Sequence, residues 1–411
     1  MTGERIVIDG GATVLVLGVA DDHRLHQLAL GGPEVRDQEP AFPTQLYPLA
    51  YPTFGEEVLR EPALRVTHAD GATATRLVVE GTSEQLHPHG RIHRVELRDR
   101  VAPLLVTLCW RTWPAYDLVE QWVEVANTGD ASATLHQAAS ASPALPGDDA
   151  WFTHWGGGWA AEWTETTERL TPGTKTVASA GGVRPSLHRP PIALFAGRGR
   201  ATEAEGSVLT ATLLWGGDTR FDAEIAMHRH ARLVAGIQHR GAERVLDPGE
   251  RFTTPTAVLL WSDAGIGPSS RALHRWARDH VVRDGHRPRA LVFNNWETMF
   301  FDLDPAKVAA VVDGAAGTGA ELFLLDDGWF GGRHPRDDDG QGLGDWMVDE
   351  RKFPDGLAPV VDHVLGTGMR FGLWIEPEMV NPRSERYEEH PDWVIAEPGL
   401  VRRVKHLSLL A

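Results

Sequence analysis

The sequence predicts a multidomain protein of β plus α/β class, in which a large β-sandwich precedes an incomplete (β/α) barrel of the TIM type. Three observations support this prediction. Short strand-like runs separated by turns fill the first 265 residues, strand and helix patterns alternate from residue 290 onward, and carboxylates follow the strands of that second region. We therefore expect an N-terminal β-sandwich domain at 1–265, a helical connector at 266–289 and the first part of a barrel domain at 290–411.

The strands of the first region are predicted from apolar and β-branched runs that lie next to turn signals. Asp70 and Gly71 lie between two such runs, at 65–67 and 75–79, which predicts a β-hairpin. Strand-like runs also flank the turn at 127–130. Further strands are predicted at 104–110, 208–215 and 257–261.

A helix is predicted between the two regions. Ser269 and Ser270 are candidates for its N-cap, and Gly285 with Pro288 would end it. Between these limits apolar residues recur at helical spacing, at Leu273, Trp276, Ala277 and Val281. We expect this helix to connect the two domains.

The second region alternates strands and helices, which predicts parallel strands. Strands are expected at 290–293, 322–325 and 370–375, and Asp304 with Pro305 opens the helix that follows the first of them. Each strand is followed by carboxylates, which are Glu297, then Asp326 and Asp327, then Glu376 and Glu378. A barrel builds its active site at these strand ends. A doubly wound sheet would do the same, but its usual Gly-rich phosphate turn is not seen here, so the barrel is favoured.

The barrel region is shorter than a whole barrel. A complete (β/α)-barrel takes about 250 residues, whereas only positions 290–411 follow the connector. An open parallel sheet of that size would expose unpaired edges. We therefore expect the barrel to be incomplete.

Composition excludes several classes of function. The net charge of −17 argues against binding nucleic acid or an anionic membrane, and is compatible with a neutral partner such as a sugar. The single cysteine, Cys109, lies in an apolar strand-like run and is expected to be a buried structural thiol. Neither a signal peptide nor an apolar run of about 20 residues is recognisable. We expect a cytoplasmic protein.

The residues that indicate chemistry gather at the predicted strand ends. Asp326 and Asp327 are adjacent, and two such carboxylates are costly to bury unless each finds donors, which sugar hydroxyls can supply. The alternative is that they cap the next turn. Tryptophans accompany the acids at the three strand ends, at Trp296, Trp346 and Trp374. This pairing predicts a sugar-binding site, although most tryptophans of a chain are core residues.

The motifs of the second region, taken in order, resemble those of the α-galactosidases of glycoside hydrolase family 36. They are Asn-Asn-Trp-Glu at 294–297, Asp-Asp-Gly-Trp-Phe at 326–330, Leu-Gly-Asp-Trp at 343–346, Lys-Phe-Pro-Asp-Gly-Leu at 352–357, Gly-Leu-Trp-Ile-Glu-Pro-Glu-Met at 372–379 and His-Pro-Asp-Trp at 390–393. Weaker likenesses lie at 51–55 and 248–250, as in that family's N-terminal β-supersandwich. The resemblance extends to about residue 398.

The resemblance implies roles for individual residues. Asp326 and Asp327 would hold the galactose hydroxyls at C4 and C6, and Trp296 and Trp346 would line the sugar pocket. Glu297, Glu376 and Glu378 would fix the shape of the site. The implied activity is hydrolysis of terminal α-linked galactose from oligosaccharides such as melibiose or raffinose, by a retaining mechanism that needs no cofactor or metal. A homo-oligomer is also implied.

The family's catalytic pair is expected outside this chain. The resemblance places the nucleophile in a Lys-Trp-Asp-x-Asn segment and the acid/base in a later Gly-rich loop, and neither occurs before Ala411. The last residues, 400–411, match no family segment, so no catalytic residue is assigned. A non-catalytic galactose-binding or structural remnant is therefore the alternative function. Transglycosylation, as in raffinose-synthase relatives, would need the same missing carboxylates.

Three clusters of possible metal ligands are discounted. His87 and His89, with His93 nearby, are expected in a surface loop between strands. His228 and His230 share one solvated strand face. The run at 337–340 lacks the spacing of a calcium-binding EF-hand. Asp326 and Asp327 are not expected to replace the catalytic pair either, because adjacent strand residues face opposite sides unless the strand bends.

Overall fold

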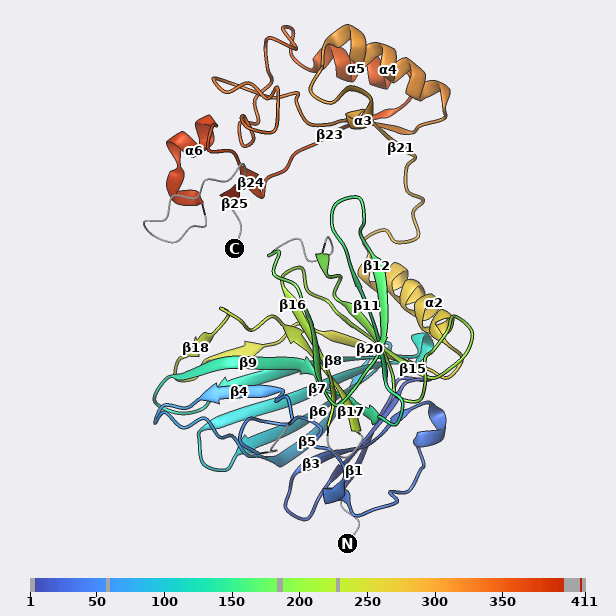
Figure 1. Cartoon of the computed structure of the whole chain (residues 1–411), viewed down its shortest axis with the longest axis vertical. Coiled ribbons are helices and arrows are strands. Elements are labelled where there is room, and N and C mark those ends of the chain that lie inside the picture. Colours follow the sequence, from blue (N-terminus) through green and yellow to red (C-terminus); the bar gives the residue numbers. More distant parts are fainter. Residues whose placement is uncertain (1–3, 57–59, 183–187, 227–229, 395–406, 409–411) are drawn as a thin grey trace. The chain divides into compact units, whose positions relative to one another are not determined.

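The computed structural model describes residues 4–56, 60–182, 188–226, 230–394 and 407–408 (Figure 1). The chain forms two compact units, Met1–Gly285 and His286–Ala411. The last twelve positions of the sequence, apart from the strand β25 (Leu407–Ser408), lie outside the described residues, and so does His228.

The first unit is built almost entirely from antiparallel strands. A three-stranded sheet contains β1 (Arg5–Asp9), β2 (Val14–Val19) and β3 (Leu25–Gly31). A ten-stranded sheet contains β5 (Leu77–His87), β6 (Gly90–Asp99), β7 (Leu104–Trp113), β8 (Leu118–Asn127), β11 (Trp151–Gly156), β12 (Thr164–Arg169), β14 (Ile192–Ala196), β15 (Val208–Leu213), β19 (Arg251–Thr253) and β20 (Ala257–Ser262). A seven-stranded sheet contains β4 (Leu64–Thr67), β9 (Ala133–Ala141), β10 (Ala144–Pro146), β13 (Gly173–Ala178), β16 (Thr219–Ile225), β17 (His230–Ile237) and β18 (Arg244–Leu246). Short 3-10 turns lie at η1 (Pro33–Val35), η2 (Thr44–Leu46) and η3 (Pro114–Tyr116).

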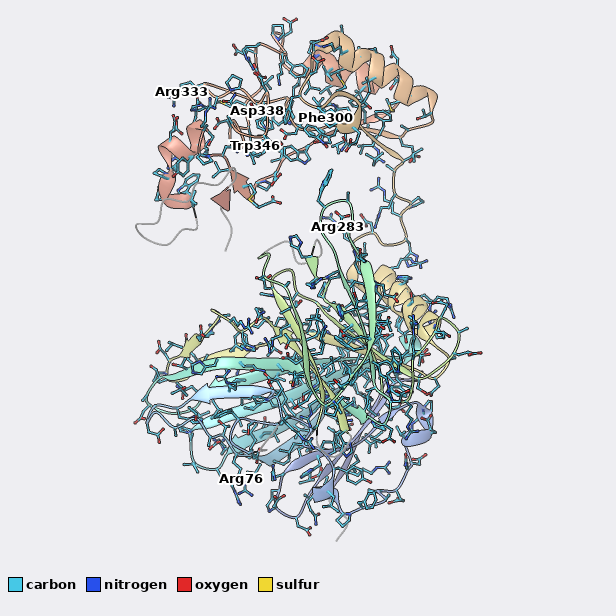
Figure 2. The ribbon with its side chains drawn as sticks, in the orientation of Figure 1. Arg76, Arg283, Phe300, Arg333, Asp338 and Trp346 are labelled. Carbon is cyan, nitrogen blue, oxygen red and sulfur yellow. The ribbon has the colours of Figure 1, made fainter. Side chains whose placement is uncertain are left out.

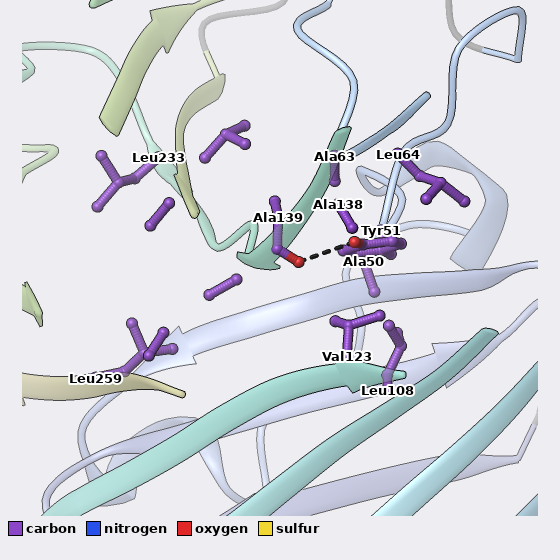
Figure 3. Close-up of a cluster of buried hydrophobic side chains, with 14 of the residues drawn as sticks. Ala50, Tyr51, Ala63, Leu64, Leu108, Val123, Ala138, Ala139, Leu233 and Leu259 are labelled. Atoms are coloured by element: carbon purple, nitrogen blue, oxygen red, sulfur yellow. Dashed lines mark hydrogen bonds between the residues drawn. The ribbon is translucent and has the colours of Figure 1, made fainter. Parts of the chain in front are cut away.

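One apolar core joins the two large sheets, which confirms the predicted β-sandwich. Leu108 and Val123 come from the ten-stranded sheet, and Leu233 and Ala139 come from the seven-stranded sheet, all within one buried cluster (Figure 3). Tyr51 lies in the same cluster and donates its hydroxyl to the Ala139 carbonyl at 2.8 Å. Burial raises the pKa of that hydroxyl, so it stays a neutral donor.

The predicted hairpin around Asp70 and Gly71 is wrong. The turn exists, because Gly71 has a φ of +85° and the His68 amide donates to the Ala72 carbonyl at 2.8 Å. The flanking strands do not pair with each other, however: β4 pairs with β9, and β5 pairs with β6. The hairpin of β5 and β6 instead turns at 88–89, so the expected surface turn next to His87 is present, but His93 is a buried residue of β6 and not part of a loop.

The turn at 127–130 carries the chain from one large sheet to the other. It follows β8 of the ten-stranded sheet and precedes β9 of the seven-stranded sheet, so its flanking strands are present as predicted but belong to different layers. The Asn127 amide donates to the Ala131 carbonyl at 2.8 Å and to the Leu246 carbonyl at 2.9 Å. The buried Asn127 side chain thereby links the turn between the two sheets to the last residue of β18.

The helix expected as a connector packs within the first unit. Helix α2 (Ile266–Trp276) begins after Gly265, so the prediction of an N-cap at Ser269 or Ser270 is wrong, and Ser269 is a buried helical residue. Its side chains Ala272 and Trp276 join a small core with Trp113 and Val258. A π-helical turn, η4 (Ala277–Val281), follows it.

The second unit has the βα repetition of a barrel. Strands β21 (Val292–Asn294), β22 (Leu322–Leu325) and β23 (Arg370–Leu373) are parallel, and β22 lies between the other two. The helices that follow the first two strands are α4 (Pro305–Gly317) and α5 (Ala358–Gly366), which pack against each other. Shorter elements are α3 (Trp296–Met299), β24 (Met379–Val380), α6 (Glu385–Glu389) and η5 (Pro391–Trp393), and β24 pairs with β25.

Local signals explain where these helices begin and how they pack. The Asp304 carboxylate accepts from the Lys307 amide at 2.9 Å, and Pro305 occupies the first helical position, which confirms the predicted start of α4. Val308 and Val312 of α4 and Val364 of α5 are buried with Phe323 of β22 in one core. No helix in the described part of the chain is long and apolar enough to cross a membrane.

Cys109 is a buried structural residue of β7, as expected. Burial, together with the nearby Glu124 carboxylate, raises the pKa of its thiol to about 12. A thiol that remains protonated at neutral pH is a poor nucleophile. The cysteine therefore contributes packing and no reactive group.

Two buried histidines make the stability of the first unit sensitive to acid. His93 and His154 are 4% and 7% exposed, and burial lowers the pKa of each despite the neighbouring carboxylates of Glu84 and Glu168. The unfolded chain binds these protons near pH 6.5, whereas the folded chain binds them only at lower pH. We expect the free energy of unfolding to fall as the pH is lowered from 7 through about 6.5 and below.

Urea denaturation at a series of pH values measures this dependence. His93→Gln and His154→Gln should each flatten it, whereas His23→Gln, which changes an exposed histidine, should leave it unchanged. A free energy of unfolding that stays constant between pH 7 and 5.5 would contradict the assignment.

Candidate functional site

The candidate site lies at the carboxyl ends of the three parallel strands. Asn294 ends β21, Asp326 follows β22 directly, and Trp374 follows β23. The parallel register places Asn294 beside Leu324, and the Trp374 amide donates to the Leu325 carbonyl at 2.9 Å. Segments that are far apart in the sequence therefore meet at one edge of the sheet, as the βα pattern predicts.

Asp326 and Asp327 lie beyond the strand, in a turn. Strand β22 ends at Leu325, and Gly328 has a φ of +99°, a conformation that suits a glycine. The alternation of strand side chains therefore does not apply to these two carboxylates. The Asp327 amide donates to Asp326 Oδ1 at 2.6 Å, so one oxygen of Asp326 caps this turn, as the alternative interpretation supposed.

Two asparagines hold Asp326 in place. Its backbone amide donates to Asn295 Oδ1 at 2.7 Å, and Asn294 Nδ2 donates to Asp326 Oδ2. Asn295 is completely buried, and its Nδ2 has no hydrogen-bond partner among the described residues. Asn294 Oδ1 accepts from the Trp296 amide at 2.8 Å. The Asn-Asn-Trp motif thus orients both a predicted acid and a predicted aromatic residue.

Asp327 forms a buried ion pair with Arg336, which the sequence analysis did not identify. Arg336 Nε donates to Asp327 Oδ1 at 2.9 Å, and a terminal nitrogen of the guanidinium donates to Oδ2 at 2.6 Å. The two residues are 2% and 6% exposed. The other terminal nitrogen donates to the carbonyls of Asp338 and Gln341 at 3.0 Å and to Asn381 Oδ1 at 3.2 Å. No sequence signal separates Arg336 from an ordinary surface arginine of a loop.

Two phenyl rings connect Arg336 with the two predicted tryptophans. Its guanidinium carbon is 5.3 Å from the centre of the Phe301 ring and 5.9 Å from that of Phe330. The Trp296 ring packs edge-on against Phe301 at 4.9 Å, and the Trp346 ring lies 4.5 Å from Phe330. Each predicted tryptophan is therefore linked to the buried cation through one phenyl ring.

Trp346 belongs to a larger aromatic cluster at the same edge. Its ring centre is 6.0 Å from that of Trp374 and 6.4 Å from that of Trp329, and Trp329 Nε1 donates to the Trp374 carbonyl at 3.0 Å. Trp346, Asp338 and Arg333 come from the long segment between β22 and α5 (Figure 2). Both Trp296 and Trp346 are half-buried, so part of each ring is accessible.

A lysine fixes the loops beneath this cluster. Lys352 Nζ donates to the carbonyls of Phe301, Gly328 and Arg336 at 3.2, 2.9 and 2.9 Å. It also forms an ion pair with Asp337 at 3.2 Å, and the pKa of that carboxyl is lowered, chiefly by a hydrogen bond from Arg351. The predicted motif at 352–357 therefore begins with a residue that ties the segment after α3 to the long connection between β22 and α5.

The remaining predicted acids occupy more peripheral positions. Glu297 is exposed on α3, and Glu376 and Glu378 are half-buried between β23 and β24.

Asp345 has a structural role. Its buried carboxylate accepts from the amides of Glu385 and Arg386 at 3.0 Å and so caps helix α6, and burial raises the pKa of this carboxyl. The described residues contain no group of three or more histidines, cysteines or acids placed to hold a metal ion.

Comparison with known proteins identifies the family. The model of the glycosyl hydrolase family 36 N-terminal domain matches residues 12–247, and the melibiase model matches residues 251–407. The chain belongs to glycoside hydrolase family 36. The resemblance noted in the motifs is thereby confirmed.

Relatives of this family 36 chain are longer than it is. It is 32% identical over 369 residues to a probable α-galactosidase G of Aspergillus terreus, covering 84% of this chain and 50% of that protein. It is 33% identical over 370 residues to the α-galactosidase AgaA of Geobacillus stearothermophilus, covering 86% and 50%. The chain thus spans about half the length of the curated relatives it matches.

Solved structures of family 36 enzymes share the fold. The α-galactosidase AgaA of Geobacillus stearothermophilus matches with a TM-score of 0.91 at 29% identity, covering 98% of this chain and 61% of that one. The α-galactosidase of Lactobacillus brevis matches with a TM-score of 0.90 at 27% identity, covering 99% and 59%. The predicted fold class, an N-terminal β-supersandwich followed by an incomplete TIM-type barrel, is confirmed.

The ion pair between Asp327 and Arg336 makes a prediction about stability. Arg336→Met leaves a buried carboxylate without its cation, which typically costs about 3–5 kcal/mol. Arg333→Met removes an exposed arginine that pairs with Glu385 and Glu388, and should cost no more than about 1 kcal/mol. Urea denaturation of the two variants measures the difference.

A second variant separates the ion pair from general packing. Adding Asp327→Asn to Arg336→Met removes the unpaired charge and should recover part of the lost stability. Equal stability of the single and the double variant, or equal losses in Arg336→Met and Arg333→Met, would contradict the role given to the pair.

Proposed function

We propose that this chain carries the galactose-recognition part of an α-galactosidase, which hydrolyses terminal α-linked galactose from oligosaccharides of the melibiose and raffinose type. The observation that carries the proposal is the buried pair Asp326 and Asp327 at the carboxyl end of β22, held by Asn294 and Arg336. Half-buried tryptophans accompany this pair at the same edge of the sheet.

The complexes of a related enzyme support the class of substrate. Structures of variants of AgaA from Geobacillus stearothermophilus in complex with raffinose and with stachyose each match this chain with a TM-score of 0.90 at 28% identity. Both ligands are galactose-containing oligosaccharides. The relatives therefore favour an α-galactosidase over a non-catalytic remnant.

The geometry suits the binding of adjacent sugar hydroxyls. A carboxylate offers about four lone-pair sites, of which the protein donors on Asp326 and Asp327 use only some. Hydroxyls that donate to the remaining sites form charge-assisted hydrogen bonds, which are stronger than neutral ones. Trp296 and Trp346 supply flat apolar faces for the C–H side of the ring.

The chemical step follows the retaining mechanism of the family. A carboxylate nucleophile forms a glycosyl-enzyme intermediate, and a second carboxyl group acts first as acid and then as base. We assign neither role to a residue of 1–411, because the motifs that would carry them do not occur in this sequence. Asp326 and Asp327 bind and orient the sugar in this scheme.

Assembly and location are further parts of the proposal. The family resemblance supports a homo-oligomer, and the single buried cysteine suits a reducing compartment such as the cytoplasm. Size-exclusion chromatography with light scattering tests the first point, and fractionation of the source cells tests the second.

Galactose binding is the first prediction of this function. The chain should bind galactose and discriminate against glucose, its C4 epimer, and Asp326→Asn should weaken galactose binding by about 10–100-fold, as the loss of a charged hydrogen bond implies. Isothermal titration calorimetry measures both. Asp362→Asn, which changes an exposed carboxylate on α5, is the matched control and should bind galactose normally. Equal affinities for the two sugars would exclude the assignment.

Turnover is tested separately with a nitrophenyl α-galactoside. We expect the folded 411-residue chain to release no nitrophenol above the level of a heat-denatured sample, since no catalytic carboxylate is assigned within it. Nitrophenol release above that level by the folded chain would contradict the expectation that residues 1–411 lack the catalytic pair.

A further inference from the structure

The first unit contains a pocket that shares no residue with the candidate site. Its volume is about 410 Å³, within the range of about 300–1,000 Å³ that is usual for small-molecule sites. The lining comes from β3 and the turn after it, from the ends of β10 and β20, and from short connecting segments. Its polar and aromatic lining includes Glu34, Tyr47, Arg198, His230, Trp261 and Asp263.

The lining of the pocket contains both apolar and aromatic residues. Leu30, Val35 and Leu145 are its buried apolar members. Trp261 and Tyr47 are half-buried in its lining, so their rings are only partly covered by other side chains. Predominantly apolar walls with a few placed polar groups are typical of sites for small organic ligands.

Two carboxylates converge at the rim. Asp263 Oδ1 accepts from Trp261 Nε1 at 3.0 Å and from Ser207 Oγ at 2.9 Å, and Glu34 Oε1 accepts from the Gly32 amide at 3.0 Å. One oxygen of each carboxylate is therefore fixed by the protein. The other two oxygens lie close together against the Gly32 backbone, because a Cβ added to Gly32 would lie 2.5 Å from Glu34 Oε2 and 2.9 Å from Asp263 Oδ2.

Gly32 has no conformational reason to be a glycine. Its φ of −79° and ψ of −170° are extended backbone that any residue adopts. What a side chain at this position would meet is the pair of carboxylate oxygens. The glycine therefore lets both carboxylates approach each other over this backbone, which a side chain would push apart.

We propose that this pocket is a second carbohydrate-binding site, which takes one ring of a neutral saccharide. The two carboxylate oxygens accept from adjacent hydroxyls, and Trp261 faces the apolar side of the ring. A cationic ligand fits less well, because Arg198 and His230 line the same pocket and offset the two acids. The proposal does not depend on Asp326 or Asp327.

Ligand-observed saturation-transfer NMR with raffinose, maltose and spermidine tests this site. The protein used is the full chain carrying Asp326→Asn, so that binding at the barrel edge is weakened. We expect transfer to at least one of the two sugars. Gly32→Ala, which places a methyl group between the two carboxylates, should weaken that binding by about tenfold or more. Gly216→Ala, where an added Cβ meets nothing within 4 Å, is the matched control and should bind normally.

A second variant pair tests the aromatic lining. Trp261→Ala should also weaken sugar binding, whereas Trp215→Ala, which changes an exposed tryptophan outside the pocket, should not. Circular dichroism and thermal unfolding check each fold, and Gly32→Ala decides the matter if Trp261→Ala does not fold. Transfer to neither sugar, sugar binding that Gly32→Ala leaves unchanged, or binding of spermidine alone would overturn the proposal. Galactose binding by Asp326 and Asp327 is measured separately, by calorimetry on the chain with both aspartates intact. None of the outcomes above changes that result.

Discussion

The buried pair of Asp327 and Arg336 is the interaction on which the second unit depends. Taking a guanidinium out of water costs several kcal/mol unless its donors are satisfied, so each nitrogen must find an acceptor. Arg336 finds them in Asp327, in the loop carbonyls of Asp338 and Gln341, and in the Asn381 side chain. Lys352 donates to three more carbonyls, two of the same segment and one of Phe301. Two cations thus order a long segment that has little regular secondary structure.

The same constraint prepares the candidate sugar site. A binding group works best when its own partners hold it in one orientation before the ligand arrives. Asn294 and Asn295 do this for Asp326, and Arg336 does it for Asp327. The phenyl rings of Phe301 and Phe330 pack between the cation and the two tryptophans. Electrostatic and aromatic contacts therefore meet at one buried arginine.

The pocket of the first unit also contains a carboxylate held in one orientation, but its partners are of a different kind. The carboxylate of Asp263 is held by an indole N–H and a hydroxyl, both neutral donors, and it stays exposed at a rim. Neutral donors suffice there because solvent already screens the charge. At the barrel edge the acids are buried, and one of them needs a cation. Burial decides which kind of partner each carboxylate requires.

The sequence by itself determined the fold class, the strand and helix alternation, the start of α4 at Asp304 and the acids and tryptophans at the strand ends, because all of these follow from short-range patterns. The family motifs added the name of the family. Only the tertiary structure decided that β4 pairs with β9, that Ser269 is buried inside α2, and that Arg336 and Lys352 hold the site together. The physical reason is the same in each case: strand pairing and buried-charge partners join segments distant in the chain, and no local spacing records which segment a strand or a cation will meet.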